Sequence, residues 1–185
     1  MKRLIVLLCA LCFVLAYGTA FGWPQLNDIP PTWSKTLRCD TTACPRFELV
    51  LGGAAVLDHE TGLVWEQSPG IDFIPWLDAM GTCQNKNVGN RKGWRLPTVE
   101  ELASLLDPTM VPPLVNLALP SGHPFSIPSI VQSDPAFWSS TTNAAFPDTS
   151  AWVVFMDNGG IAATFVKVGN RYVWCVRGGQ GYDGK

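Results

Sequence analysis

The sequence predicts an α+β domain in which helices pack on antiparallel sheets. Apolar residues recur at helical spacing between positions 75 and 106, which predicts two helices. Residues 47–66 are rich in strand formers, and three short apolar runs separated by tight-turn signals follow position 150. Strands and helices that are segregated along the chain, rather than alternating, are typical of the α+β class.

The first 22 residues have the order of a secretory signal. Lys2 and Arg3 precede the apolar run Leu4–Ala16, and small residues follow at 18–22. The alternative is an uncleaved membrane anchor, but the run is shorter than the roughly 20 residues that span a bilayer. We expect a signal peptide at 1–22 and a secreted or periplasmic protein that can reach the cell surface, with no membrane insertion after cleavage.

Cleavage would leave four cysteines, and an even number in an exported chain indicates two disulfides. Four cysteines allow three pairings. We favour a short loop between Cys39 and Cys44 and a long one between Cys83 and Cys175. A zinc site is the alternative, but it needs paired thiolates at closer spacing than these.

The charge balance excludes some partners. Without Lys2 and Arg3 the chain has a net charge of about −4. Nucleic acid and anionic membranes both select basic surfaces, so neither is expected as the main partner.

The expected elements follow in chain order. Residues 23–46 are rich in proline and predict an extended N-terminal arm. From Phe47, apolar runs on both sides of the turn at 58–62 predict a β-hairpin that ends at Glu66, with an interruption at the paired glycines 52 and 53. The domain is expected to cover 47–179, with a flexible tail at 180–185.

Two helices are expected next. The first spans 75–84, where Trp76, Ala79 and Cys83 lie on one face. The second begins with a capping box from Thr98 to Glu101, and Leu102, Leu105 and Leu106 form its buried stripe.

The remaining chain is predicted to be a long loop and then a β-meander. Residues 108–136 are proline-rich and without periodicity, which predicts a functional or mobile loop. Strands are expected at 151–156, 161–168 and 172–177, with turns at the Asp-Asn-Gly-Gly of 157–160 and at Gly169.

Several motifs, taken in order, resemble one known family. They are Asp-x-x-Thr-Gly-Leu-x-Trp-Glu at 58–66, Trp-x-x-Ala-x-x-x-Cys at 76–83, Gly-Trp-Arg-Leu-Pro-Thr at 93–98, Phe-Trp-Ser-Ser-Thr at 137–141 and Cys-Val-Arg-Gly at 175–178. This order resembles the Lcl C-terminal domain family, a bacterial domain of unknown function named for a collagen-like adhesin. The resemblance covers roughly 47–179.

The resemblance implies a C-type-lectin-like fold in which a long disulfide ties the first helix to the last strand, in agreement with a Cys83–Cys175 bond. It also implies an exported protein, and the adhesin for which the family is named binds sulfated glycans. The chain departs from that adhesin because it has no collagen-like repeat and its net charge is negative. Fold alone does not carry function.

Catalysis is not expected. His59 lies in a predicted turn and His123 in the proline-rich loop, and neither is part of a catalytic pattern. Ser139 and Ser140 lack the Gly-x-Ser-x-Gly context of a nucleophile, so we expect them to fix a strand through backbone hydrogen bonds. The glycines at 179–184 match the dinucleotide pattern, but one residue follows them and no helix can hold a pyrophosphate.

No cofactor and no metal are expected. The oxygen-ligand motifs of calcium-dependent lectins are absent, and the partial match at 146–148 is not sufficient. Arg95 is expected to pair with a carboxylate such as Glu101, with an anion contact as the alternative. Trp65, Trp76, Trp94 and Trp138 are expected mainly in the core.

The function expected from the sequence is binding or adhesion, with a glycan or an extracellular or envelope protein as partner. The alternative is a structural subunit of an envelope or cell-surface assembly. In lectin-like folds the long loops and the late meander form the binding face, where an aromatic platform such as Trp152 or Phe146 would lie beside polar groups. The expected ligand-binding residues are Asn143, Asp148, Trp152, Asp157, Lys167 and Arg171.

Overall fold

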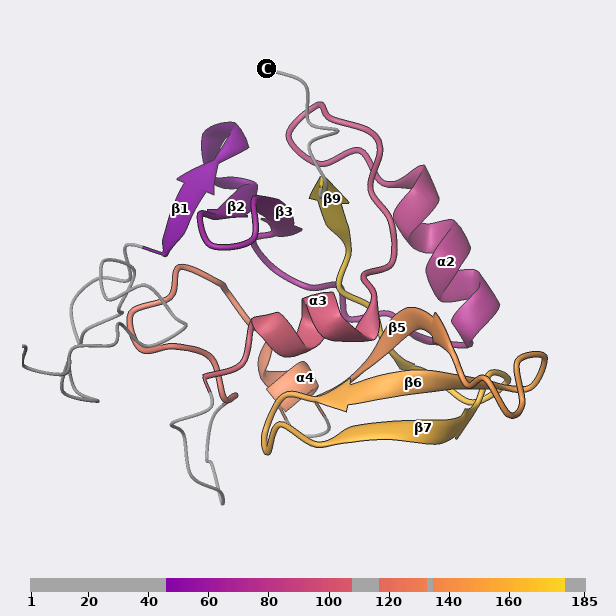
Figure 1. Cartoon of the computed structure of the whole chain (residues 1–185). Helices are drawn as coiled ribbons and strands as arrows, with labels where there is room; N and C mark the ends of the chain where they lie inside the picture. The colour runs from indigo at the N-terminus through magenta and orange to yellow at the C-terminus, as the bar shows by residue number, and fades with distance from the viewer. Residues whose placement is uncertain (1–45, 108–116, 133–134, 179–185) are drawn as a thin grey trace, which may run out of the picture. The chain divides into compact units, whose positions relative to one another are not determined.

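The computed structural model describes residues 46–107, 117–132 and 135–178, which belong to one compact unit, Thr36–Lys185 (Figure 1). The predicted signal peptide, Cys39, Cys44 and the tail at 180–185 lie outside the described residues. None of the described helices has the length and hydropathy of a membrane span.

The first sheet has four strands, and it confirms the expected hairpin. Strands β1 (Phe47–Val50), β2 (Ala55–Asp58) and β3 (Leu63–Glu66) pair in sequence, and β9 (Val176–Gly178) closes the order β1-β2-β3-β9. All three pairings are antiparallel. The glycines at 52 and 53 lie in a 3-10 turn between β1 and β2 and have φ of 68° and 88°, which few other residues adopt.

The second sheet has five strands in the order β4-β8-β5-β6-β7. They are β4 (Phe73–Ile74), β5 (Ala136–Thr142), β6 (Ser150–Phe155), β7 (Ile161–Val166) and β8 (Arg171–Tyr172). The β5-β6-β7 meander is antiparallel. The expectation of purely antiparallel sheets is wrong at one pairing, because β8 runs parallel to β5.

The expected strand at 172–177 is also wrong, since it is two short strands in different sheets. Tyr172 ends β8, and the chain then crosses to the first sheet, where Val176 begins β9. Residues 173–175 between them are buried and are held by other groups. The amide of Cys175, for example, donates to the Glu66 carboxylate rather than to a strand. Residues 172–176 are apolar because this stretch of chain passes through the interior, not because it forms one continuous strand.

The loop expected at 108–136 is partly ordered. The structure places a short helix, α4 (Ser129–Gln132), within it, and β5 begins at its last residue. The larger apolar side chains of this segment that are buried in the core are Leu117, Leu119, Phe125 and Val131. Apolar residues scattered between prolines follow neither the helical nor the strand period, so the sequence did not predict that they would be buried.

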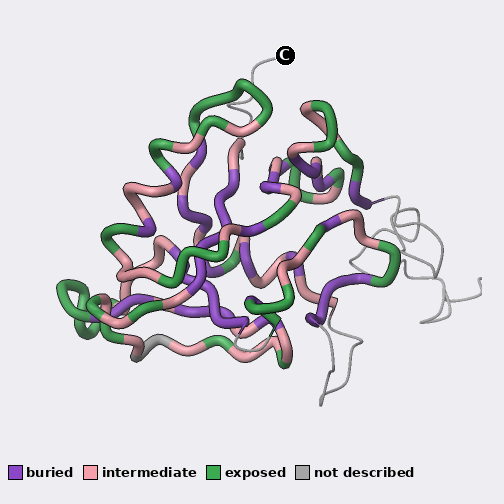
Figure 2. Tube along the Cα trace, turned by 180° about the vertical axis from the view of Figure 1, so that it is seen from behind, coloured by how far each residue is buried: buried purple, intermediate pink, exposed green. Residues whose placement is uncertain are grey.

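Helices α2 (Trp76–Asn85) and α3 (Val99–Ser104) both contact the second sheet (Figure 1), and the two core clusters assign them to opposite faces of it. Neighbouring residues of β6 show this, because Val153 belongs to the core cluster of α2 and Val154 to that of α3. Side chains alternate between the faces of a strand, so the sheet separates two cores. Figure 2 shows the buried strands between more exposed helices and turns.

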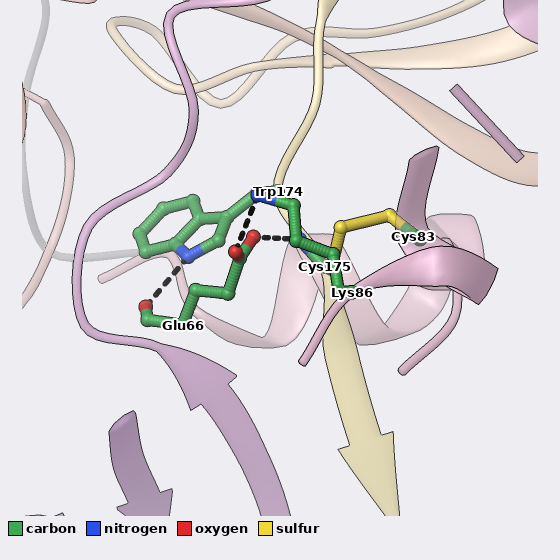
Figure 3. The surroundings of a disulfide bond; sticks show 5 residues. All are labelled: Glu66, Cys83, Lys86, Trp174 and Cys175. Carbon is green, nitrogen blue, oxygen red and sulfur yellow. Dashed lines mark hydrogen bonds and ion pairs between the residues drawn. A yellow bond between two sulfur atoms is a disulfide. The ribbon is translucent and has the colours of Figure 1, made fainter. Parts of the chain in front are cut away.

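The disulfide between Cys83 and Cys175 is present and confirms the expected pairing, at a sequence separation of 92. It ties the last turns of α2 to the residue before β9. Non-covalent contacts surround it (Figure 3). The buried Glu66 carboxylate accepts the Cys175 amide at 2.9 Å and pairs with Lys86 at 2.7 Å, three residues beyond Cys83.

A buried ion pair fixes the start of the domain. The Arg46 guanidinium donates two hydrogen bonds of 2.8 and 2.7 Å to the Asp58 carboxylate, and one of 2.7 Å to the Ser104 carbonyl. Asp58 also accepts the Glu60 amide and the Thr61 hydroxyl. Both members of the pair are buried, so Arg46 contributes to the interior although sequence analysis assigned it to the arm.

Candidate functional site

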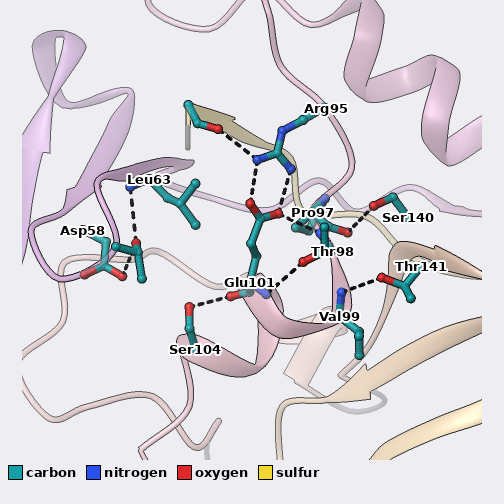
Figure 4. A network of polar contacts seen from close by, with 12 residues as sticks. Asp58, Leu63, Arg95, Pro97, Thr98, Val99, Glu101, Ser104, Ser140 and Thr141 are labelled. Atoms are coloured by element: carbon teal, nitrogen blue, oxygen red, sulfur yellow. Dashed lines mark hydrogen bonds and ion pairs between the residues drawn. The ribbon is translucent and has the colours of Figure 1, made fainter. Parts of the chain in front are cut away.

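The predicted capping box positions α3 beside the second sheet (Figure 4). The Thr98 hydroxyl accepts the Glu101 amide, and the Glu101 carboxylate accepts the Thr98 amide at 2.8 Å. The same carboxylate receives two hydrogen bonds from Arg95, at 2.7 and 2.6 Å. A third hydrogen bond joins Arg95 to the Gly178 carbonyl. This confirms the expected Arg95–Glu101 pair and ties α3 to β9.

The ionisation of Glu101 is coupled to this pair. Burial alone would raise the pKa of Glu101, but the hydrogen bonds from Arg95 and the Thr98 amide outweigh it, so the pKa lies below its usual value. The hydrogen bond to Glu101 raises the pKa of Arg95. The carboxylate therefore contributes stability above its ordinary pKa, and this contribution is lost as the pH falls through the lowered value.

Glu101→Gln is expected to lower the free energy of unfolding at pH 7 by about 1 kcal/mol, because the amide accepts the capping bond but loses the charge. The difference from wild type should shrink as the pH falls through the lowered pKa of Glu101. Urea unfolding between pH 7 and pH 3 measures this. The control is Glu100→Gln on the exposed side of the same helix, which should leave stability unchanged; an equal effect of both variants would contradict the account.

Three hydroxyls of β5 hold this helix and β6 in place. The Ser139 hydroxyl donates to the Trp152 carbonyl at 3.0 Å, and the Ser140 hydroxyl donates to the Pro97 carbonyl at 3.1 Å. The Thr141 hydroxyl accepts the Val99 amide at 3.0 Å. The expectation that Ser139 and Ser140 make backbone hydrogen bonds is confirmed. Thr141 satisfies an amide at the start of α3, which fixes α3 over β5 and β6.

A groove opens between α3 and the β6–β7 part of the sheet. Its volume is about 330 Å³, and Trp152 lines it as a half-buried side chain. The remaining lining residues are Val99, Glu100, Ala103, Thr141 and Ile161. The wall is therefore mainly apolar, with one tryptophan ring, one carboxylate and one hydroxyl. An apolar wall with few polar groups is typical of ligand sites.

The structure brings some of the predicted ligand-binding residues together at one end of β6. Asn143 and Asp148 lie in the β5–β6 loop, and Lys167 follows β7 at the same end, where its amide donates to the Thr149 carbonyl. The Lys167 ammonium lies 3.9 Å from the centre of the Trp76 ring and donates to the Pro147 carbonyl at 2.6 Å. Lys167 therefore holds the loop against α2.

Arg171 and Asp157 are placed differently. The Arg171 guanidinium lies 4.2 Å from the centre of the Phe165 ring, on the α2 side of the sheet. Asp157 lies in the β6–β7 turn, at the far end of β6. Since six strand residues span about 20 Å, Asp157 and the Asn143–Asp148 loop cannot contact one small ligand. The six predicted residues do not form one site, and only Trp152 lines the groove.

The other lining residues of the groove were not predicted from the sequence. Glu100 and Ala103 lie on the side of α3 away from its buried leucines, and their spacing of three residues was a usable signal. The sequence marked Thr141 only as part of the Phe-Trp-Ser-Ser-Thr motif at 137–141, not as a groove residue. Ile161 lies on β7, the strand next to that of Trp152, and no local sequence pattern links the two residues.

A second cavity of about 370 Å³ lies in the segment after residue 116, beside Leu119, His123 and Phe125. Burial lowers the pKa of His123, and its ring nitrogen accepts the Phe125 amide. His59 is elsewhere, paired with Glu48 on the surface. Within the described ranges, no three side chains of His, Cys, Asp or Glu converge as a metal site would require.

Comparison with known proteins adds one finding. The Lcl C-terminal domain matches residues 54–177, which is more than half of the 185-residue chain. The match includes the whole second sheet, part of the first sheet, α2, α3 and the groove, as well as both cysteines of the long disulfide. No curated protein matches the sequence. The chain belongs to the Lcl C-terminal domain family.

Proposed function

We propose that this chain is an exported, non-catalytic binding module, and that the groove between α3 and β6–β7 takes its ligand. The observation that carries the proposal is the position of Trp152, which lines a hollow of about 330 Å³ instead of being sealed in the core. Four other tryptophans are almost fully buried: Trp65, Trp94, Trp138 and Trp174. A half-buried tryptophan in a hollow is a common anchor for ligands.

A C-type-lectin-like fold is part of the proposal. Two helices on opposite faces of a sheet, and a disulfide that joins the first of them to the residue before the last strand, support it. Export is supported by the same disulfide, because such bonds persist in oxidising compartments. A binding role without catalysis is supported by the hydroxyls of Ser139 and Ser140, which are engaged by carbonyl oxygens.

The lining of the groove favours some ligands over others. A tryptophan ring beside a hydroxyl and a carboxylate suits an apolar sugar face or a side chain of a partner protein. No lysine or arginine is among the described residues that line the groove, so these residues offer a sulfate no cationic side chain. A sulfated glycan is therefore not the ligand that we propose for this groove.

The test is a glycan and peptide array screened with the oxidised mature chain, with and without calcium chelator. Trp152→Ala should weaken every specific ligand at least about tenfold, because it removes the central anchor. Ala103→Phe should have the same effect by filling the groove while Trp152 is kept. Leu77→Ala, on the exposed side of α2, is the matched control and should bind as wild type does.

Thermal unfolding of each variant separates lost binding from lost folding. A specific ligand that still binds both groove variants but no longer binds Phe146→Ala would contradict the proposed groove. It would place the site at the β5–β6 loop, where Phe146 is exposed. Binding that depends on calcium would contradict the expected absence of a metal.

A further inference from the structure

We infer that the groove selects a cationic side chain of a polypeptide partner, with the apolar stem of a lysine or arginine against Trp152 and its charge beside Glu100. This inference rests on the proposed function, because it names the ligand class of the same groove. It is carried by the distribution of charge on the elements that form the groove and by the chemistry of its lining.

The elements around the groove carry no basic residue. Strands β5, β6 and β7 contain no charged residue at all, and the charged residues of α3 are Glu100 and Glu101. The β6–β7 turn that adjoins Ile161 adds Asp157. Every charge on these elements is negative, so the local potential favours a cation and opposes an anion.

The two glutamates of α3 have different partners. The Glu101 carboxylate is occupied by Arg95 and the Thr98 amide on the side of the helix that faces β9. Glu100 is exposed, lines the groove, and makes no ion pair with any described residue. The carboxylate available to a ligand is therefore the one beside Trp152.

The apolar part of the lining suits the stem of a basic side chain. Val99, Ala103 and Ile161 line the groove with Trp152. Lysine and arginine place their methylene stems along apolar surface while the charged group remains near water. A cation over a tryptophan ring gains a further attraction, which is strongest for this ring. The arrangement thus fits an apolar stem that ends in a positive charge.

The same chain contains an internal example of this contact. The Lys167 ammonium lies over the Trp76 ring at 3.9 Å and donates to the Pro147 carbonyl at 2.6 Å. There, both partners belong to the protein and the contact closes the β5–β6 loop. At Trp152 the ring and a carboxylate are present, whereas no described residue supplies the cation.

The test uses calorimetric titration of the oxidised mature chain with two acetylated, amidated hexapeptides. They are identical except that arginine in one is replaced by citrulline, its uncharged isostere, in the other. The arginine peptide should bind at least about tenfold more tightly at low salt, and the preference should shrink as ionic strength rises. Glu100→Gln should remove the preference, and Glu100→Lys should reverse it toward a glutamate peptide.

The control is Glu48→Gln, which removes an exposed carboxylate on β1 and should leave the preference intact. Equal binding of both peptides that is lost with Trp152→Ala would overturn the cationic preference while the proposed groove stands. Peptide binding insensitive to Trp152→Ala would overturn both. Absence of binding by either peptide would overturn this inference alone, because the array decides whether the groove binds another ligand.

Discussion

Replacing both Cys83 and Cys175 with alanine is expected to lower the free energy of unfolding by about 4–5 kcal/mol. The bond closes a loop across 92 residues of sequence separation, and the entropy that it removes from the unfolded chain grows with loop length. For a domain of this size the melting temperature should fall by roughly 10–15 °C. Thermal and urea unfolding of the oxidised wild type and of the double variant measure the effect.

The variant should lose stability but keep its fold. The Glu66 carboxylate still accepts the Cys175 amide and still pairs with Lys86, so α2 remains attached to the chain before β9. Reduced wild type should be less stable than the double variant, because reduction also opens the predicted Cys39–Cys44 loop. Cys39→Ala with Cys44→Ala is the matched control, and loss of that short predicted loop should cost about 2 kcal/mol. A double variant of Cys83 and Cys175 that melts as wild type does would contradict the bracing role.

Asp58→Ala is expected to lower the free energy of unfolding by about 3–5 kcal/mol. The change removes the carboxylate that holds the buried Arg46 guanidinium by two hydrogen bonds, and loss of one member of a buried ion pair is strongly destabilising. Glu60, 3.2 Å from Arg46 and partly exposed, compensates the buried charge only in part. The change also frees the Glu60 amide and the Thr61 hydroxyl that shape the β2–β3 turn. Urea unfolding at pH 7 is the measurement.

Glu48→Ala is the matched control for this prediction. Glu48 pairs with His59 in the same hairpin region, but both side chains are largely exposed, at 59% and 41%. Solvent screens such a pair, so its loss should cost less than about 1 kcal/mol. Similar losses for Asp58→Ala and Glu48→Ala would show that burial does not decide the strength of the Arg46–Asp58 pair.

The local elements could be predicted from the sequence because their signals are local. The capping box at Thr98 needs only the spacing of a hydroxyl and a carboxylate, and the structure confirms it. The helix expected at 75–84 is found at Trp76–Asn85, since its apolar spacing and its preceding proline mark it. The Arg95–Glu101 pair follows from the same short stretch.

The predictions that were wrong concern features that depend on contacts between segments far apart in the sequence. Residues 172–177 look like one strand because residues 172–176 pass through both cores and are buried and apolar, whether or not they pair with a neighbouring strand. The parallel pairing of β8 with β5 leaves no mark in either strand. Asp58 looked like a turn residue, and its burial is decided by Arg46, twelve positions away.

In the candidate site, too, features with a local sequence signal were predicted and those set by long-range contacts were not. Trp152 could be named from the sequence as an aromatic platform, and it lines the groove. Its expected companions were chosen from loops at both ends of the meander, although a strand of six residues keeps those ends about 20 Å apart. Glu100 and Ala103 lie close to Trp152 only because α3 is fixed over β5 by Thr141.

The most direct test of the proposed groove is a nitrogen–proton correlation spectrum of the labelled mature chain, titrated with the tightest ligand from the array. The account predicts shifts confined to the amides of the groove residues and the Trp152 indole. The groove residues are Val99, Glu100, Ala103, Thr141, Trp152 and Ile161. Shifts centred instead on Asn143, Asp148 and Lys167, with an unmoved Trp152 indole, would contradict it.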